Sequence, residues 1–400
     1  MKLLVAADAH LFVLKDGSYW CDSVETYDFW KRYLNVFDSI RVVTRVKPVD
    51  FIDSHYRRAD GPNVEIWEIP FFQGPKQLLR RYWSIRRAFG GCFQSCDCAL
   101  FRVPSQTAYM ALSELPKGLP FAGEVVYCQR DSLVGLKPGV MKMLYLILSH
   151  RLEHFCLRAN GVSYVTEKAI QRYYPNQAML HGESNEFFSS YYSSIVLNPE
   201  YFAGPRCFDG MKKITLSISD AAMDSERKGE RIVIKVVNRL RSKGLDVSAI
   251  IIGDGSKRSE YEQLAESLGI SAYINFVGQQ PAEEVRRCLL NSDIYILPTQ
   301  GEGLPRGILE AMALGLPVLS TPVGGIAEVV EAKYLFNPLD VDGFTCAIEN
   351  LYRNVDQLEV VSKRNFEKAL EYQSGVLQGR RDAFYMKLKK LALARKEKTR

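Results

Sequence analysis

Short apolar runs alternate with segments of helical periodicity along most of the chain. This alternation is typical of βαβ units, in which helices join parallel strands. In the first half, apolar runs predict buried strands at 3–7, 40–46, 64–69, 98–102, 124–128 and 161–165. A second series begins near residue 214 and continues at 248–252, 272–277, 294–297 and 317–320. The polar and aromatic stretch 181–205 interrupts the pattern and is the expected linker.

The length of the chain agrees with two domains rather than one. A single hydrophobic core rarely grows beyond about 250–300 residues, and this chain has 400. We expect an N-terminal Rossmann-like domain at 1–195, a C-terminal Rossmann-like domain at 206–375 and a final segment at 376–400. Apolar residues at helical spacing, from Val376 to Leu393, predict a terminal helix with a basic tail.

Composition and charge exclude several classes of protein. With 47% hydrophobic and 24% charged residues, the chain resembles an ordinary globular protein. A net charge of +6 with 46 acidic residues argues against a nucleic-acid partner. Nine scattered cysteines, an odd number, fit free thiols in a reducing compartment. Asp8 interrupts the first apolar run too early for a secretory signal, and no run reaches the ~20 residues that cross a bilayer. We expect a cytoplasmic chain, peripheral on the inner face of the membrane.

Two glutamates with seven residues between them form the strongest candidate site. Glu302 follows the apolar run 294–297, and Glu310 lies in the first turns of the helix that comes next. In an open α/β sheet, ligands bind beyond the carboxyl ends of the strands. Two carboxylates there suit a ligand rich in hydroxyl groups, one for a sugar ring and one for a ribose. The alternative is a solvated loop glutamate and a first-turn glutamate favoured by the helix dipole.

The sequence around these glutamates is similar to that of a known family. Residues 301–313 read Gly-Glu-Gly-Leu-Pro-Arg-Gly-Ile-Leu-Glu-Ala-Met-Ala, and Gly-Leu-Pro-Val and Thr-Pro-Val-Gly-Gly-Ile-Ala-Glu-Val-Val follow at 315–318 and 321–330. This region resembles the donor-site signature of family 4 retaining glycosyltransferases. Further matching pieces lie at 251–255, 275–278 and 292–295, and weaker ones at 33–38, 102–105 and 163–167. The likeness is greatest to the bacterial branch that builds capsular and other surface polysaccharides.

The resemblance implies both an architecture and a reaction. The architecture is GT-B, an α/β fold of two Rossmann-like domains facing across a cleft, with the last helix returning to the N-terminal domain. The reaction is retaining transfer of a hexose-type sugar from a nucleotide-diphosphate donor to a saccharide or lipid-linked acceptor. The nucleotide sugar is a co-substrate, and neither a cofactor nor a metal is expected. Two other functions stay open: a GT-B sugar-nucleotide epimerase, and a catalytically silent scaffold in a polysaccharide assembly complex.

The resemblance also implies roles for donor-site residues. Glu310 would orient the ribose, Glu302 the transferred sugar, and Lys228 the diphosphate. The family's usual Arg before this Lys is missing, because 219–222 read Ser-Asp-Ala-Ala. Arg306 is its predicted replacement, whereas the side chain of Arg227 should point elsewhere. The remaining predicted donor contacts are Gly253, Gly255, Gly278, Thr299, Gly303, Leu304, Pro305, Gly324 and Gly325.

Two of these glycine pairs have a purely structural alternative. For Gly253 and Gly255, the favoured interpretation is a tight turn that shapes the nucleotide pocket, and a direct contact with phosphate is the alternative. Gly324 and Gly325 precede a predicted helix, whose free N–H groups could meet a pyrophosphate. The alternative for the second pair is a plain loop.

The acceptor side is less clearly marked. Asp8 and His10 close the first predicted strand and should face the cleft, although a His that caps the next element is equally compatible. Arg130 and Asp131 are secondary candidates. The catalytic His that some family members carry at that place is absent.

Two basic, apolar segments are candidates for contact with a membrane. Residues 76–89 alternate basic and aromatic side chains in a predicted helix, and Lys137, Lys142 and Arg151 flank the apolar stretch 141–148. Such faces suit an anionic lipid surface. A solvated charged face is the alternative.

Two patterns in the sequence give only weak support for a metal site. His150, Glu153 and His154 match the pattern of inverted zinc peptidases, but so short a pattern often arises by chance. Cys92, Cys96 and Cys98 lack a paired Cys-x-x-Cys and a nearby His. No Asp-x-Asp motif appears where a metal-dependent GT-A enzyme would need it. We therefore predict no metal site.

Overall fold

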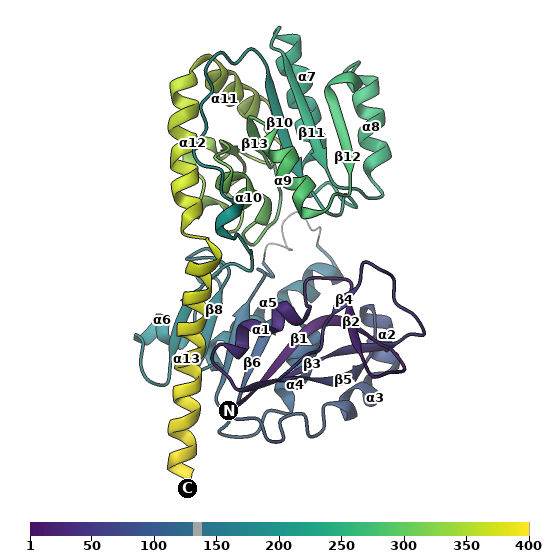
Figure 1. Ribbon diagram of the computed structural model, residues 1–400, viewed down its shortest axis with the longest axis vertical. Coiled ribbons are helices and arrows are strands. Elements are labelled where there is room, and N and C mark those ends of the chain that lie inside the picture. Colours follow the sequence, from purple (N-terminus) through teal and green to yellow (C-terminus); the bar gives the residue numbers. More distant parts are fainter. Residues whose placement is uncertain (131–137, 400) are drawn as a thin grey trace.

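The computed structural model describes residues 1–130 and 138–399. Two α/β domains are stacked along the longest axis, and the last two helices run along one side of both (Figure 1). Each domain has its own, mainly parallel sheet. The predicted fold class is thereby confirmed. Asp131 and Lys137 lie outside the described residues.

The first domain is built on a nine-stranded sheet of order β4-β2-β1-β6-β7-β8-β9, in which β3 also pairs with β1 and β5. Its parallel strands are β1 (Lys2–Val13), β3 (Ser39–Pro48), β5 (Val64–Pro70), β6 (Cys98–Val103), β7 (Phe121–Val125), β8 (Gly161–Tyr164) and β9 (Phe188–Tyr191). Its helices are α1 (Tyr27–Leu34), α2 (Gly74–Arg80), α3 (Tyr82–Ala88), α4 (Gln106–Ser113), α5 (Val140–Arg158) and α6 (Gln177–His181).

The first strand is longer than predicted. It continues past Ala7 to Val13, with a shift of register between Ala6 and His10. Its last two residues, Phe12 and Val13, pair antiparallel with β2 (Tyr19–Cys21), which pairs antiparallel with β4 (Arg57–Arg58). The prediction that Asp8 and His10 close this strand is therefore wrong, because β3 pairs with the backbone as far as Val13 and β2 adds a second partner at the end.

Two further strands depart from the sequence pattern. β7 covers 121–125 instead of 124–128. A side chain at Gly123 would overlap the ring of Phe155, so a residue of low strand propensity is needed in a buried strand. β9 lies inside the predicted linker, which is therefore wrong in its first part. Phe188 buries its ring against Gly161 and fixes β9 to the sheet.

The second domain has a five-stranded parallel sheet of order β12-β11-β10-β13-β14. The strands are β10 (Ile214–Ser219), β11 (Val247–Ile252), β12 (Ile274–Gly278), β13 (Ile294–Ile296) and β14 (Val318–Leu319). The helices are α7 (Glu230–Ser242), α8 (Arg258–Ser267), α9 (Ala282–Leu290), α10 (Arg306–Ala313) and α11 (Val341–Arg353). Strand order reverses between β10 and β13, and a crevice for ligands opens at such a point.

The last two helices tie the domains together. α12 (Val355–Leu370) packs on α10, and α13 (Ser374–Thr399) crosses to the first domain, where it contacts β6, β8, β9 and α1. Phe384 packs its ring on Phe188 at 5.2 Å, and the Tyr385 hydroxyl donates to Glu124 at 2.6 Å. The predicted return of the terminal helix is confirmed. Among the described residues, no helix combines the length and apolar character required to cross a bilayer.

Candidate functional site

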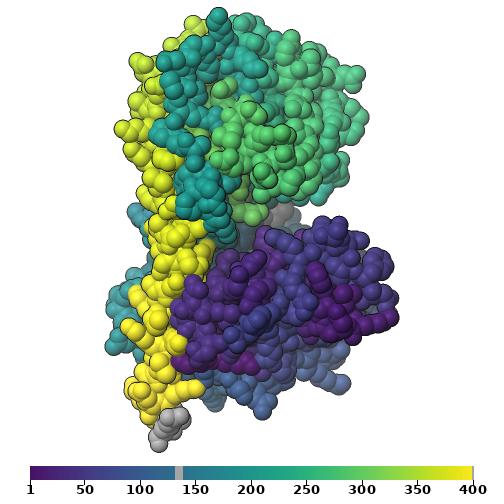
Figure 2. Space-filling view, in the orientation of Figure 1, coloured from purple at the N-terminus to yellow at the C-terminus, as the bar shows by residue number. Residues whose placement is uncertain are grey.

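A cavity of about 720 Å³ lies between the two domains, and Figure 2 shows the groove between the lobes. The second domain contributes the carboxyl ends of β10 and β11 and the loop that leads into α10. The first domain contributes Val126, Tyr127, Val165, Ser193 and Ser194. The cavity thus lies at the crevice predicted from the order of the strands.

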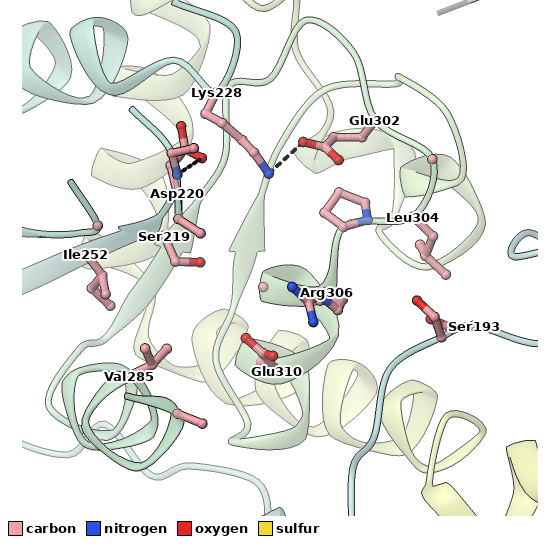
Figure 3. Close-up of a pocket in the computed structure, with 18 of the residues that line it drawn as sticks. Ser193, Ser219, Asp220, Lys228, Ile252, Val285, Glu302, Leu304, Arg306 and Glu310 are labelled. Carbon is pink, nitrogen blue, oxygen red and sulfur yellow. Dashed lines mark hydrogen bonds and ion pairs between the residues drawn. The ribbon is translucent and has the colours of Figure 1, made fainter. Parts of the chain in front are cut away.

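An ion pair joins the two principal predicted residues. The Nζ atom of Lys228 lies 2.6 Å from Oε1 of Glu302, and the side chains are 18% and 13% exposed (Figure 3). Lys228 precedes Gly229, whose φ of 92° and close approach to the carbonyl of Pro298 leave no room for a side chain. This approach presses the start of α7 against the end of β13. The lysine therefore reaches the loop that carries Glu302.

Arg227 also contacts this loop, contrary to prediction. Its Nη1 atom donates to the carbonyl of Gly301 at 3.0 Å, and its own carbonyl accepts from the N–H of Gln300 at 2.8 Å. Its side chain lines the cavity together with that of Lys228. The segment before Gly229 is neither helix nor strand, so adjacent side chains need not point in opposite directions. Arg227 consequently supports the backbone next to Glu302.

Glu310 and Arg306 both face the cavity from α10 (Figure 3). Burial raises the pKa of Glu310, while Arg306 and Lys228 oppose that rise. A side chain at Gly307 would overlap the hydroxyl groups of Tyr295 and Ser219, so glycine lets α10 approach the sheet closely. This approach places Glu310 near the carboxyl end of β10. A carboxylate there can accept hydrogen bonds from a diol.

Gly253 and Gly255 hold two loops together. A side chain at Gly253 would overlap the carbonyl of Asp220, and one at Gly255 would come within 2.6 Å of the backbone of Met223. The N–H of Gly253 donates to the carbonyl of Gly278 at 2.9 Å and is not free for a phosphate. Only Gly253 of these three glycines lines the cavity. The contacts give them a structural role in shaping it.

Gly324 and Gly325 support the Glu302 loop from behind. A side chain at Gly324 would overlap the carbonyl of Glu302, and the N–H of Gly325 donates to the carbonyl of Gly303 at 2.5 Å. The predicted helix after them is only a 3₁₀ turn at Ile326–Glu328. Neither glycine lines the cavity, so the prediction of a helix start that faces a pyrophosphate is wrong.

The remaining predicted donor residues divide into two groups. Gly303, Leu304 and Pro305 line the cavity directly. Thr299 is buried beneath the loop, where its hydroxyl accepts from the N–H of Gly301 at 3.3 Å and its carbonyl accepts from the hydroxyl of Thr321 at 2.8 Å. Thr299 therefore supports the loop without lining the cavity.

Asp8 and His10 do not line the cavity. The carboxylate of Asp8 accepts from the Thr107 hydroxyl at 2.5 Å and the Gln106 N–H at 3.3 Å, at the start of α4, and pairs with Arg45. His10 packs edge-on against a phenylalanine ring, and burial lowers its pKa.

The first domain presents Tyr127, Ser193 and Ser194 to the cavity instead. No motif in the sequence marks these residues, which only follow strands. Arg130, a secondary candidate, stacks on the ring of Tyr173 with its Cζ atom 5.1 Å from the centroid.

Potential metal ligands gather at one place in the described part of the chain. Cys207, Asp209 and Glu359 could share an ion, and none of them lines the cavity. His150 and His154 are exposed on α5 and belong to no such group within residues 1–130 and 138–399.

Comparison with known proteins agrees with this geometry. Residues 215–354 match the family model described as "Glycosyl transferases group 1". The chain is 27% identical over 372 residues to Protein CapJ of Staphylococcus aureus, covering 91% of this chain and 90% of CapJ. It is 26% identical over 238 residues to the putative colanic acid biosynthesis glycosyltransferase WcaL of Salmonella typhimurium, covering 53% and 59% of the two chains.

Solved structures share the fold. WaaG, a glycosyltransferase involved in lipopolysaccharide biosynthesis, superposes with a TM-score of 0.61 at 15% identity, covering 95% of this chain and 98% of its own. HepE of Anabaena, in complex with UDP-glucose, gives a TM-score of 0.60 at 14% identity and covers 96% and 98%. The chain thus carries a glycosyl transferases group 1 domain at residues 215–354, on the GT-B fold of these glycosyltransferases.

Proposed function

We propose that the protein transfers a sugar from a nucleotide-diphosphate donor to a polyprenyl-diphosphate-linked saccharide, with retention of anomeric configuration, during synthesis of a surface polysaccharide. One observation carries the proposal: the Lys228–Glu302 pair, Arg306 and Glu310 converge on an interdomain cavity. The names of the colanic acid glycosyltransferase WcaL and the amylovoran glycosyltransferase AmsK of Erwinia amylovora support the polysaccharide setting. The UDP-glucose complex of HepE supports the class of donor.

The charged groups of the second domain account for stabilisation of the leaving group. A departing nucleoside diphosphate gains negative charge, and fixed positive groups stabilise that charge most in the transition state. Lys228 and Arg306 supply two such groups, and Arg306 begins an eight-residue helix whose N-terminus also favours an anion. Glu310 holds the ribose, and Glu302 accepts from hydroxyl groups of the transferred sugar.

The proton of the acceptor hydroxyl leaves with the donor phosphate. In the front-face mechanism that the family resemblance implies, an oxygen of the departing diphosphate takes this proton as the acceptor oxygen bonds to the anomeric carbon. A separate protein base is then unnecessary, which fits the position of His10 outside the cavity. We further propose that transfer needs no metal, so that activity should persist in EDTA.

A ligand screen followed by a transfer assay tests the proposal. Ligand that binds only the folded protein raises its melting temperature, so UDP, GDP, dTDP and CMP are compared first. The matching nucleotide sugars are then supplied with a lipid-linked saccharide, and NMR determines the anomeric configuration of the product. Retained configuration supports the proposal, and inverted configuration contradicts the mechanism. Isomerised donor without acceptor indicates an epimerase, and binding without turnover indicates a silent scaffold.

Membrane attachment through the first domain is part of the proposal. The predicted helix at 76–89 is in fact two helices, α2 and α3, because the backbone leaves helical geometry at Arg81. Leu79 and Trp83 are 73% and 71% exposed beside basic residues. The start of α5 exposes further large apolar side chains: Val140, Met141, Met143, Leu144, Leu146 and Ile147. Apolar side chains beside positive charge suit an anionic lipid surface.

Vesicle binding tests this attachment. A variant with four arginines replaced by Gln should no longer bind anionic vesicles but should still turn over a soluble acceptor. The four are Arg80, Arg81, Arg86 and Arg87. Gln in place of Arg287 and Arg353, exposed arginines of the other domain, is the control. If the first variant binds vesicles as well as wild type at a stated salt concentration, the charged faces of these helices are solvated and do not contact the membrane.

A further inference from the structure

One carboxylate of the second domain binds a turn of the first. Glu328 ends the 3₁₀ turn Ile326–Glu328, and its carboxylate accepts from the consecutive backbone N–H groups of residues 167–169, at 2.6, 2.8 and 2.5 Å. Successive N–H groups in a turn form a concave site that suits an anion. Hydrogen bonds to a charged acceptor are roughly twice as strong as neutral ones. This contact therefore fixes one domain against the other more firmly than neutral contacts would.

Both sides of this contact lead directly to the large cavity. On the first-domain side, the bound turn follows Val165, which lines the cavity. On the second-domain side, the N–H of Gly325 donates to the carbonyl of Gly303, next to Glu302. Gly325 also lets the domains approach closely, because a side chain there would overlap the methyl group of Thr166. Hydrogen bonds thus connect the loop that carries Glu302 to the segment that follows the first-domain wall of the cavity.

We propose that Glu328 is a positioning residue for sugar transfer, which holds the first-domain wall and the acceptor bound on it at the correct distance from the Glu302 loop. Glu328 does not line the cavity, so it touches neither substrate. The groups proposed to hold the donor, Lys228, Arg306 and Glu310, all belong to the second domain. Their arrangement does not depend on the contact, whereas the approach of the acceptor does. The inference rests on the proposed function, because it takes the first domain as the acceptor side.

Steady-state kinetics that measure transfer and donor hydrolysis separately test this role. In hydrolysis, a water oxygen bonds to the anomeric carbon, the bond to the diphosphate breaks, and the proton of the water goes to the departing diphosphate. No acceptor has to be presented by the first domain. A misplacement of about 1 Å can lower a rate about 10²-fold, so Glu328→Ala should lower turnover in transfer by about that factor. Donor hydrolysis and the calorimetric affinity for the nucleoside diphosphate should stay unchanged.

Two further variants sharpen the comparison. Glu328→Gln keeps a neutral acceptor of the same length, so transfer should fall less than in Glu328→Ala. Glu328→Gln also covers the case that Glu328→Ala does not fold. Glu331→Ala is the matched control, since Glu331 lies in the same segment and pairs with Lys333 of its own domain at 3.8 Å. It should behave as wild type in every assay.

Hydrogen exchange of backbone amides tests the contact itself without any turnover. A hydrogen bond to a charged acceptor contributes enough that the N–H groups of residues 167–169 should exchange about ten- to hundredfold faster in Glu328→Ala than in wild type. The amides of β11, in the second sheet, are the internal reference and should exchange equally in both proteins. Faster exchange at β11 as well would reveal general destabilisation.

Faster exchange at 167–169 together with a selective loss of transfer supports the proposal. Equal exchange in wild type and both Glu328 variants shows that the contact does not form in solution and overturns it. Faster exchange with unchanged transfer, or a parallel loss of transfer, hydrolysis and nucleotide affinity, assigns Glu328 a purely structural role and also overturns it. Absence of transfer by wild type contradicts the proposed function and the positioning role with it, whereas failure confined to the Glu328 variants leaves the transferase proposal standing.

Discussion

Glu302→Gln should bind a free nucleoside diphosphate more tightly than wild type and yet turn over more slowly. In the structure, Oε1 of Glu302 lies 2.6 Å from Nζ of Lys228, so the ammonium group is already paired. A diphosphate that approaches Lys228 must compete with this carboxylate. Removing the negative charge releases the lysine for the nucleotide. The same change takes a charged acceptor away from the hydroxyl groups of the transferred sugar.

The size of the effect follows from the burial of the pair. Fully exposed ion pairs contribute about 0–1 kcal/mol, and hydrogen bonds to charged groups about 1.5–3 kcal/mol. Side chains that are 18% and 13% exposed fall between these cases, so the pair contributes ~1–2 kcal/mol. At 1.4 kcal/mol per factor of ten, nucleotide affinity should rise about five- to thirtyfold. Loss of a charge-assisted bond to the sugar should lower turnover about ten- to hundredfold.

Calorimetry with the nucleotide chosen by thermal shift, and steady-state turnover of its sugar, measure the two effects. Glu226→Gln is the matched control, since Glu226 lies in the Lys228 loop, pairs with Arg231 at 2.9 Å and does not line the cavity. It should change neither quantity. If Glu302→Gln binds the nucleotide no better than wild type, Glu302 does not compete for Lys228 and the reasoning fails.

Four further predictions follow from individual contacts. Glu310→Ala should weaken free-nucleotide binding about tenfold by calorimetry, since a ribose diol loses a charged acceptor; wild-type affinity would refute its role. Arg306→Ala should lower turnover ~10²–10³-fold. Arg227→Ala should lower it less, because Arg227 only supports the backbone at Gly301. Wild-type turnover of Arg306→Ala would show that Arg306 is merely a surface residue. The Glu328 carboxylate accepts hydrogen bonds from the backbone N–H groups of residues 167–169 in the first domain, at 2.5–2.8 Å. Glu328→Ala should therefore lower the free energy of unfolding, measured in urea, by about 1–3 kcal/mol. Burial raises the pKa of Glu230 to about 8, so the folded chain holds a proton that the unfolded chain releases above its ordinary pKa of 4.5. Stability should fall as pH rises from 4.5 to 8, and Glu230→Gln should flatten that fall in melting curves; an unchanged slope would refute it.

The alternation of apolar runs and helical segments was sufficient to predict two α/β domains. Such runs record which segments are buried on both faces of a parallel sheet. The hydrophobic pattern failed to predict strands where a strand contains few apolar residues or is held by distant partners. The pattern missed β9 inside a polar stretch, because Phe188 is the one fully buried residue of this strand, where it packs against Gly161. The extension of β1 depends on its pairing with the end of β3 and with β2, which no local pattern reveals.

The candidate donor site could be placed in part from sequence, because its residues are close together along the chain. Glu302, Arg306 and Glu310 lie in one loop and the helix that follows it, so helical spacing brings them to one cavity. The side-chain direction of Arg227 could not be inferred, because it lies in an irregular segment. There, direction depends on tertiary contacts such as the carbonyl of Gly301.

The two-domain α/β architecture, and the end of the second sheet where the candidate residues gather, could both be predicted from the sequence. Both depend on local periodicity and on residues near one another in the chain. The pairing of Lys228 with Glu302 and the gathering of Arg32, Arg102 and Arg381 around Glu124 become visible only in the folded chain. These groups come from separate strands, loops and helices, up to 349 positions apart. Their distances depend on how whole elements pack, and local patterns carry no record of that packing.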